Sequence, residues 1–195
     1  MFKRTKGYFL LTMLVLTGLA GRMHSNILST KERHTLVIEL KTSRNDFLKN
    51  VDGLSARQMN YKLRKKDPSI KDYIYKMVSI ETALWSACKA SLKHEPSSIQ
   101  KTYTDETLSS VIQQQQRFFP TINFASSKEA LKLYKNEEAE MLKYVHTSTE
   151  NIRGHAVHTN FGNFDCYQLI LLTTIYCKYY TEQIEKIKAN SKFPE

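Results

Sequence analysis

The sequence predicts an all-α protein, a single bundle of four long helices. Apolar residues recur at three- and four-residue steps through four long stretches, and each stretch begins near a residue that can cap a helix. No stretch alternates apolar and polar residues for long enough to predict a sheet. The 195 residues, 41% of them hydrophobic, suit one globular domain. We therefore place the bundle at residues 25–195, behind a targeting segment at residues 1–24.

The first half of the chain contains two of the four helices. A capping box opens at Ser29, and the apolar stripe that follows predicts a helix ending near Asp52. Asp67, followed by a proline, predicts the start of the second helix, which runs to about His94. A weaker helical pattern follows at residues 104–116, and the aromatic residues Phe118 and Phe119 that end it are expected to pack back on the bundle.

The second half contains the other two helices. A capping box that opens at Ser126 predicts the third helix, which closes near Gly154. Residues 155–162 are expected to form a short loop. Asn163 or Asp165 can then cap the fourth helix, because a short side-chain oxygen accepts hydrogen bonds from the free amides of the first turn.

The N-terminal segment has the pattern of a secretory signal. Lys3, Arg4 and Lys6 form a positive region, and residues 8–20 form an uncharged, leucine-rich run that is short for a membrane span. Small residues at its end predict cleavage near Ala20. We expect export to a periplasmic or extracellular location with no membrane span after cleavage; the alternative is an uncleaved anchor at residues 8–20.

The net charge of +10 does not by itself predict nucleic-acid binding. Four of the 29 basic residues precede Ser25, which leaves 25 basic against 19 acidic residues, a net charge of +6. These remaining basic residues are scattered among acids along the helices, and no clustered basic and aromatic motif is present. We expect no nucleic-acid partner.

The three cysteines are Cys88, Cys166 and Cys177, so at least one thiol stays unpaired within the chain. Cys166 and Cys177 lie on one predicted helix, about 16 Å apart along its axis, too far for a disulfide. Cys88 could meet either of them if its helix packs against the fourth. The favoured interpretation is three buried thiols that pack as small apolar side chains.

Three segments carry a resemblance to a known family. Residues 51–59 read VDGLSARQM, residues 68–81 read PSIKDYIYKMVSIE, and residues 176–184 read YCKYYTEQI. In this order they resemble the connector, second helix and fourth helix of the DinB-like four-helix bundles. That family is related to thiol-transferases and presumed metal-dependent hydrolases, and the likeness spans roughly residues 30 to 190. Its members bind a divalent metal through one histidine on the second helix and an H-x3-H pair on the fourth.

The resemblance places Lys76, Tyr176 and Tyr180 at the three metal-ligand positions, while Glu81 and Gln183 keep the family's residue types. A lysine ammonium has no lone pair to give a metal. Phenols with a pKa near 10 are poor ligands. We therefore expect no metal and no other cofactor, and a structural polar pocket in which Lys76 donates to the phenols or to Glu81. The alternative is a buried Lys76 of lowered pKa that acts as base or nucleophile.

Two further groups of side chains are candidate sites. His155 and His158, with Asp165 nearby, could form a second metal site, but the favoured interpretation is two exposed loop histidines. Cys177 could be a nucleophile, but no histidine lies near it in the sequence. No phosphate-binding loop, zinc-protease motif or paired catalytic carboxylate motif is present.

The sequence thus predicts an exported, non-catalytic DinB-like bundle that binds an unknown small molecule or partner protein. The alternative is a transferase or hydrolase of that family working through an altered site at Lys76, Tyr176 and Tyr180. A homodimer is a third expectation, because such bundles often pair through helix faces.

Overall fold

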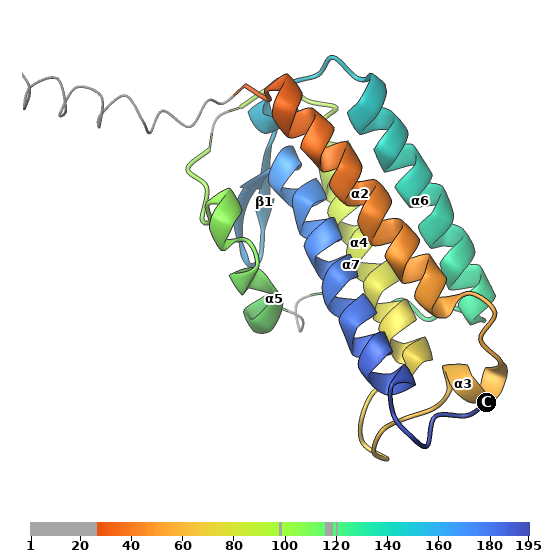
Figure 1. Ribbon diagram of the computed structural model, residues 1–195. Helices are drawn as coiled ribbons and strands as arrows, with labels where there is room; N and C mark the ends of the chain where they lie inside the picture. The colour runs from red at the N-terminus through yellow and green to blue at the C-terminus, as the bar shows by residue number, and fades with distance from the viewer. Residues whose placement is uncertain (1–26, 98, 116–118, 120) are drawn as a thin grey trace, which may run out of the picture.

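Four long helices form one bundle in the computed structural model, which describes residues 27–97, 99–115, 119 and 121–195 (Figure 1). They are α2 (Thr30–Val51), α4 (Ile70–Ser91), α6 (Ser127–Thr147) and α7 (Cys166–Lys188). The short helix α3 (Ala56–Met59) lies between α2 and α4 in the chain. The predicted fold class is confirmed, whereas the predicted signal segment at 1–24 lies outside the described residues.

Each long helix packs against two others. α7 packs against α2 and α4, and α6 packs against the same two helices. Figure 1 shows that α2 and α7 run in one direction and α4 and α6 in the other. Consecutive helices α4 and α6 are therefore parallel neighbours, so the chain must cross the whole length of the bundle between them.

Local capping explains where several helices begin. The Ser29 side chain accepts from the Glu32 amide in the capping box that the sequence predicted, and Asp52 is the C-cap of α2. Of the two candidates at the start of α7, Asp165 is the N-cap, with Gln168 completing its capping box. These predictions are confirmed because each depends on contacts within one turn of helix.

The predicted start and end of α4 were wrong by a few residues. Ser69, not Asp67, is the N-cap, because Asp72 stands three residues after it and completes a capping box. Asp67 instead accepts from the Arg64 guanidinium at 2.9 Å. The helix ends at Ser91, three residues before the predicted end.

The predicted end of α6 near Gly154 was also wrong. The helix stops at Thr147, and Ile152–Gly154 form a separate 3-10 turn, η4. Arg33 of α2 donates to the carbonyl oxygens of Val145 and Glu150, both at 2.8 Å. The Arg33 guanidinium thus supplies a hydrogen bond to the Val145 carbonyl, which has no partner within the helix once α6 ends.

The segment predicted as a loop at 155–162 belongs to an antiparallel hairpin. Strand β1 (Ala156–Thr159) pairs with β2 (Gly162–Asp165), with Ala156 opposite Asp165. Gly162 has a φ of +146°, and a Cβ there would lie 3.0 Å from the Thr102 side chain. Four-residue strands are too short to show a period-two pattern, so the prediction missed them.

The long crossing between α4 and α6 lies beside this hairpin. It contains a 3-10 turn, η2 (Asp105–Thr107), and helix α5 (Ser110–Gln115), where the sequence predicted a weak helix. The Thr102 amide donates to the Asn163 carbonyl at 2.9 Å, and the Asn163 amide donates to the Thr102 hydroxyl at 2.8 Å. Because β1 contacts α4 and β2 contacts α7, the hairpin covers part of the α4–α7 interface.

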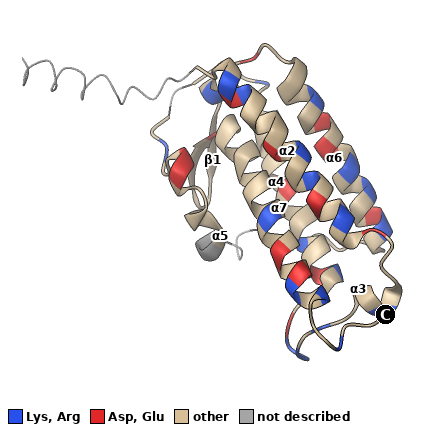
Figure 2. Cartoon of the chain, viewed as in Figure 1, with Lys and Arg blue, Asp and Glu red and all other residues tan. Residues whose placement is uncertain are grey.

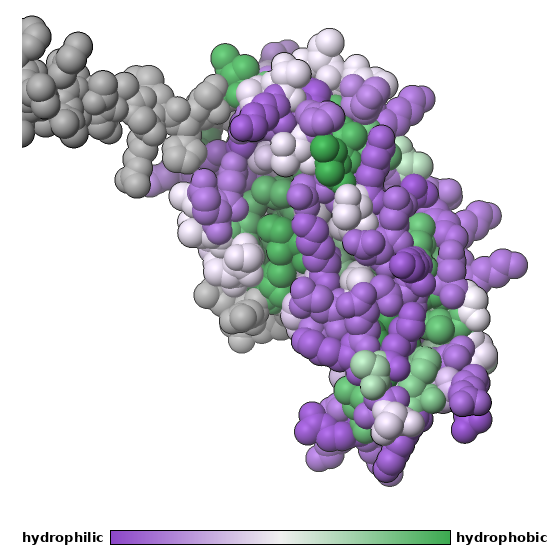
Figure 3. Space-filling model, in the orientation of Figure 1, coloured by the Kyte–Doolittle hydropathy of each residue, from purple (hydrophilic) through white to green (hydrophobic). Residues whose placement is uncertain are grey.

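Basic and acidic residues are interspersed along the helices (Figure 2). The face drawn in Figure 3 is mostly hydrophilic and carries separate hydrophobic patches. In the described part of the chain, none of the helices combines the length and the apolarity needed to cross a bilayer.

Candidate functional site

Tyr176 and Tyr180 of α7 lie inside the molecule, at two of the positions that the resemblance assigns to metal ligands. Their side chains are 0% and 2% exposed. They are one helical turn apart, and their rings stack with centroids 6.4 Å apart and planes 17° apart. Neither hydroxyl has a hydrogen-bond partner among the described residues. Burial raises the pKa of both phenols, so both are neutral at physiological pH.

Lys76 of α4 is half-buried, and its contact differs from the one predicted. Its ammonium donates to the main-chain carbonyl of Phe119 in the crossing segment. In the described chain it makes no hydrogen bond to either tyrosine or to Glu81, so that part of the expected polar network is wrong. The Phe119 ring meets the Tyr176 ring edge-on at 5.8 Å. Lys76 and Tyr176 therefore share Phe119 as a neighbour instead of bonding to each other.

Further aromatic rings close over the two tyrosines. Tyr73 and Tyr179 contact the Tyr180 ring, with centroids 5.8 and 5.1 Å away. On the other side, Phe119 packs on Phe161 of the hairpin turn at 5.1 Å. We call Tyr73, Phe119, Phe161, Tyr176, Tyr179 and Tyr180 the aromatic cluster. These apolar ring faces fill the space between α7 and the segments that cover it.

Glu81 and Gln183, the other two predicted pocket residues, lie apart from this contact. Glu81 is 0% exposed, and its carboxyl lies near that of Glu138 on α6. Gln183 is half-buried on α7, and within the described residues its side chain makes no hydrogen bond. The structure thus brings Tyr176 and Tyr180 together, links Lys76 to them through Phe119, and turns Glu81 toward a different neighbour.

The carboxyls of Glu81 and Glu138 form a buried pair in the centre of the bundle. Burial and the neighbouring charge of Glu138 raise the pKa of Glu81 well above its ordinary value. Burial raises the pKa of Glu138 to about 7. Arg44 of α2 supplies the positive charge that opposes both shifts. Glu138 stands four residues after Tyr134 and three before Met141, both buried, so its helical phase was the signal that could have revealed the pair.

The cysteines are buried and free. The Cys177 thiol donates to the Ser43 carbonyl at 3.2 Å and lies 3.3 Å from the Tyr134 hydroxyl. Burial raises the pKa of this thiol, so it is not a nucleophile at neutral pH. Cys88 meets Cys166, and each thiol contacts the other's carbonyl oxygen, at 3.6 and 3.8 Å. The interpretation of three buried thiols is confirmed.

The second metal site considered for His155, His158 and Asp165 is not formed. His155 is buried, which corrects the expectation of an exposed loop residue, and its Nε2 lies 2.9 Å from Glu150 Oε1. His158 is exposed, and its Nδ1 lies 3.1 Å from the Asn163 amide oxygen. The two histidines therefore have separate partners, Glu150 and Asn163, and do not face a common site.

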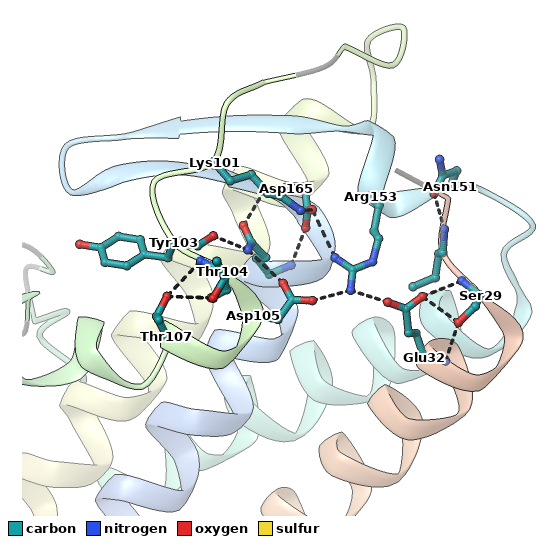
Figure 4. A network of polar contacts seen from close by, with 12 residues as sticks. Ser29, Glu32, Lys101, Tyr103, Thr104, Asp105, Thr107, Asn151, Arg153 and Asp165 are labelled. Carbon is teal, nitrogen blue, oxygen red and sulfur yellow. Dashed lines mark hydrogen bonds and ion pairs between the residues drawn. The ribbon is translucent and has the colours of Figure 1, made fainter. Parts of the chain in front are cut away.

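Asp165 belongs to an ion-pair network that the sequence did not predict (Figure 4). Arg153, only 8% exposed, donates to Asp105 at 2.6 Å and to Glu32 at 2.7 Å, and it lies 3.5 Å from Asp165. Lys101 also pairs with Asp165, at 3.0 Å. Burial acts to lower the pKa of Arg153, but these carboxylates outweigh it and raise the pKa. The network joins α2, the crossing, η4 and the N-cap of α7, and because its ion pairs link four segments it has a structural role.

A structural comparison identifies the architecture. YfiT from Bacillus subtilis, described as a probable metal-dependent hydrolase with an unusual four-helix bundle topology, matches with a TM-score of 0.60. The fold is that of the DinB-like bundles. The match covers 83% of this chain and 88% of YfiT at 12% sequence identity, which shows the fold alone. No protein-family model matches the sequence, and no curated protein does.

The residues at the DinB-like ligand positions do not fit a divalent metal. Lys76 offers only donor hydrogens, and Tyr176 and Tyr180 are neutral phenols whose rings are packed against other aromatic groups. Among the described residues, no group of three histidine, cysteine, aspartate or glutamate side chains is arranged to hold a metal ion. At these positions the chain thus carries side chains that are poor metal ligands.

Proposed function

We propose that the protein is a non-catalytic binding bundle that has lost the metal site of its fold relatives. One observation carries this proposal: Tyr176 and Tyr180, which the sequence resemblance places at two ligand positions, stack on each other and are buried. Neutral, packed phenols supply neither a metal ligand nor an accessible reacting group. What such a bundle retains is a rigid helical surface on which a small molecule or a partner protein can bind.

Metal analysis of the purified protein tests the loss of the site. We expect no stoichiometric zinc or nickel after dialysis, and no rise in melting temperature when either metal is added, because neither would bind the folded state. One tightly bound metal per chain would contradict the proposal. It would favour the enzyme alternative, in which Lys76, whose pKa is lowered by burial, takes part in the chemistry.

A gain-of-function variant sharpens this test. Lys76→His, Tyr176→His and Tyr180→His together return three imidazoles to the ligand positions, and nickel at 100 times its Kd should then stabilise the fold by about 2.7 kcal/mol. The single variant Lys76→His, which keeps both tyrosines, is the matched control and should show no such shift. If the triple variant does not fold, metal analysis of the unmodified protein still decides the question.

The proposal includes export, which rests on the basic and leucine-rich pattern of residues 1–24. Expression in a bacterial host followed by mass spectrometry of the N-terminus should show cleavage near Ala20. An intact N-terminus on protein retained in the cytoplasm would contradict export, without bearing on the binding role.

A further inference from the structure

A cavity of about 640 Å³ opens at the α3 end of the bundle, where α2 ends and α6 begins. Its floor is apolar: Val51 is fully buried there, and Leu54, Met59 and Leu131 are partly buried. This volume is within the range of about 300–1,000 Å³ that is usual for small-molecule sites. The cavity shares none of its lining with the aromatic cluster, so it is a separate place on the molecule.

The rim of this cavity is strongly basic. Lys71, Lys128, Lys132 and Lys135 line it, against one acid, Asp52. Asp52 lies 3.6 Å from Lys135, and no described carboxylate lies in ion-pair distance of the other three lysines. We call the cavity, with its apolar floor and these lysines, the lysine-rimmed groove.

The position of the lysines follows from the sequence of α6. Residues 128, 131, 132 and 135 are spaced by three and four, so Lys128, Leu131, Lys132 and Lys135 share one face of this helix. Blue segments recur along α6 in Figure 2. Like charges one helical turn apart repel each other, so this arrangement costs a little stability. An anion bound between the lysines would remove that repulsion.

A second cavity differs from the lysine-rimmed groove in the charge of its lining. It has a volume of about 510 Å³, lies between α2 and α7, and has three lysines and three acids in its lining, namely Lys49, Lys178, Lys188, Asp46, Glu182 and Glu185. Two of these lysines are already engaged, Lys178 with Glu39 and Lys188 with the Asn50 carbonyl. Charge in that cavity is balanced, whereas the lysine-rimmed groove has positive charge in excess over an apolar floor.

We propose that the lysine-rimmed groove binds a small amphipathic anion, with an apolar chain on the floor and a carboxylate head between Lys128 and Lys132. This inference names a ligand class for the binding role proposed above and rests on it. The floor supplies the apolar contact area and the unpaired ammonium groups supply the matching charge. A head group without a chain would gain only exposed ion pairs, which are weak.

Calorimetric titration of the purified full chain with dodecanoate, below its micelle concentration, tests the ligand class. We expect one site per chain, with an affinity that falls about fourfold for each methylene removed on going to decanoate and octanoate. Added salt should weaken binding by screening the lysines. Dodecyltrimethylammonium, with the same chain and the opposite charge, and inorganic phosphate alone should not bind. Absence of dodecanoate binding, or equal binding of the cationic amphiphile, would overturn the proposal.

A paired variant tests the location. Lys128→Gln with Lys132→Gln should weaken dodecanoate binding about tenfold, since two exposed ionic contacts are lost. Lys41→Gln with Lys186→Gln makes the same change in charge on exposed residues outside the groove and should leave the affinity unchanged. Equal affinities for the two double variants would place the anion elsewhere and overturn the assignment.

The two proposals can fail separately. A metal found at stoichiometry with dodecanoate binding intact would end the non-catalytic proposal and leave the groove as a ligand site. If the protein contains no metal and does not bind dodecanoate, only the groove proposal is rejected.

Discussion

The aromatic cluster and the lysine-rimmed groove belong to the same helical bundle but differ in burial and in charge. In the cluster, Tyr176 and Tyr180 are buried, uncharged and covered by other rings. In the groove, Leu131 stays partly exposed and Lys128 and Lys132 have no acidic partner in the described chain. The first region is closed by packed rings, whereas the second leaves part of its apolar surface accessible. A shared fold therefore does not carry a shared function, which depends on the side chains placed at each site.

The comparison of the two regions predicts that substitutions in the aromatic cluster cause the largest loss of stability. Tyr176→Ala should lower the free energy of unfolding by about 3–5 kcal/mol, because it leaves a cavity in a packed interior. Leu131→Ala, on the groove floor, should cost less than about 1.5 kcal/mol, because its side chain is already partly exposed. Urea denaturation followed by circular dichroism measures both. Similar losses at the two positions would remove the distinction between a packed and an open region.

A second effect should appear in the pH dependence of stability. The unfolded chain releases the protons of Glu81 and Glu138 near pH 4.3, whereas in the folded protein burial raises the pKa of Glu138 to about 7 and raises the pKa of Glu81 well above its ordinary value. The free energy of unfolding should therefore fall as pH rises from about 4.3 through 7, by up to about 1.4 kcal/mol per pH unit for each proton.

Variants separate this buried pair from other acids. Replacing both residues, Glu81→Gln with Glu138→Gln, should flatten the decline in stability between pH 5 and pH 8, measured by urea denaturation at each pH. Glu182→Gln, which alters an exposed acid, is the control and should leave the slope unchanged. An unchanged slope in the double variant would mean that the pair is ionised in the folded protein.

The smallest effect concerns the groove lysines. Removing Lys128 and Lys132 by substitution with glutamine should change stability by no more than about 0.5 kcal/mol, and at low salt in the stabilising direction, because like charges four residues apart repel. Thermal denaturation at low and high salt measures it. A loss of more than about 1 kcal/mol would show that these lysines hold the fold, and the contrast with the aromatic cluster would then fail.

The sequence by itself determined what depends on neighbours along one helix. Capping at Ser29 and Asp165 was predicted because those contacts close within one turn, and the inner stripes were predicted because helical phase follows from residue spacing. The four-helix architecture follows from the same spacing, since four apolar stripes of this length must be buried against each other. Residue types at the ligand positions also indicated, without coordinates, that a metal fits them poorly.

Only the tertiary structure decided which side chains from different elements meet. Lys76 was expected to bond Tyr176 or Glu81, but the crossing segment places the Phe119 carbonyl within its reach. Glu81 meets Glu138 from another helix, and Arg153 gathers carboxylates from three segments. The lysine-rimmed groove forms where three helix ends leave space between them. Helical phase specifies the direction in which a side chain points, but its partner is set by the packing of helices and crossings far apart in the chain.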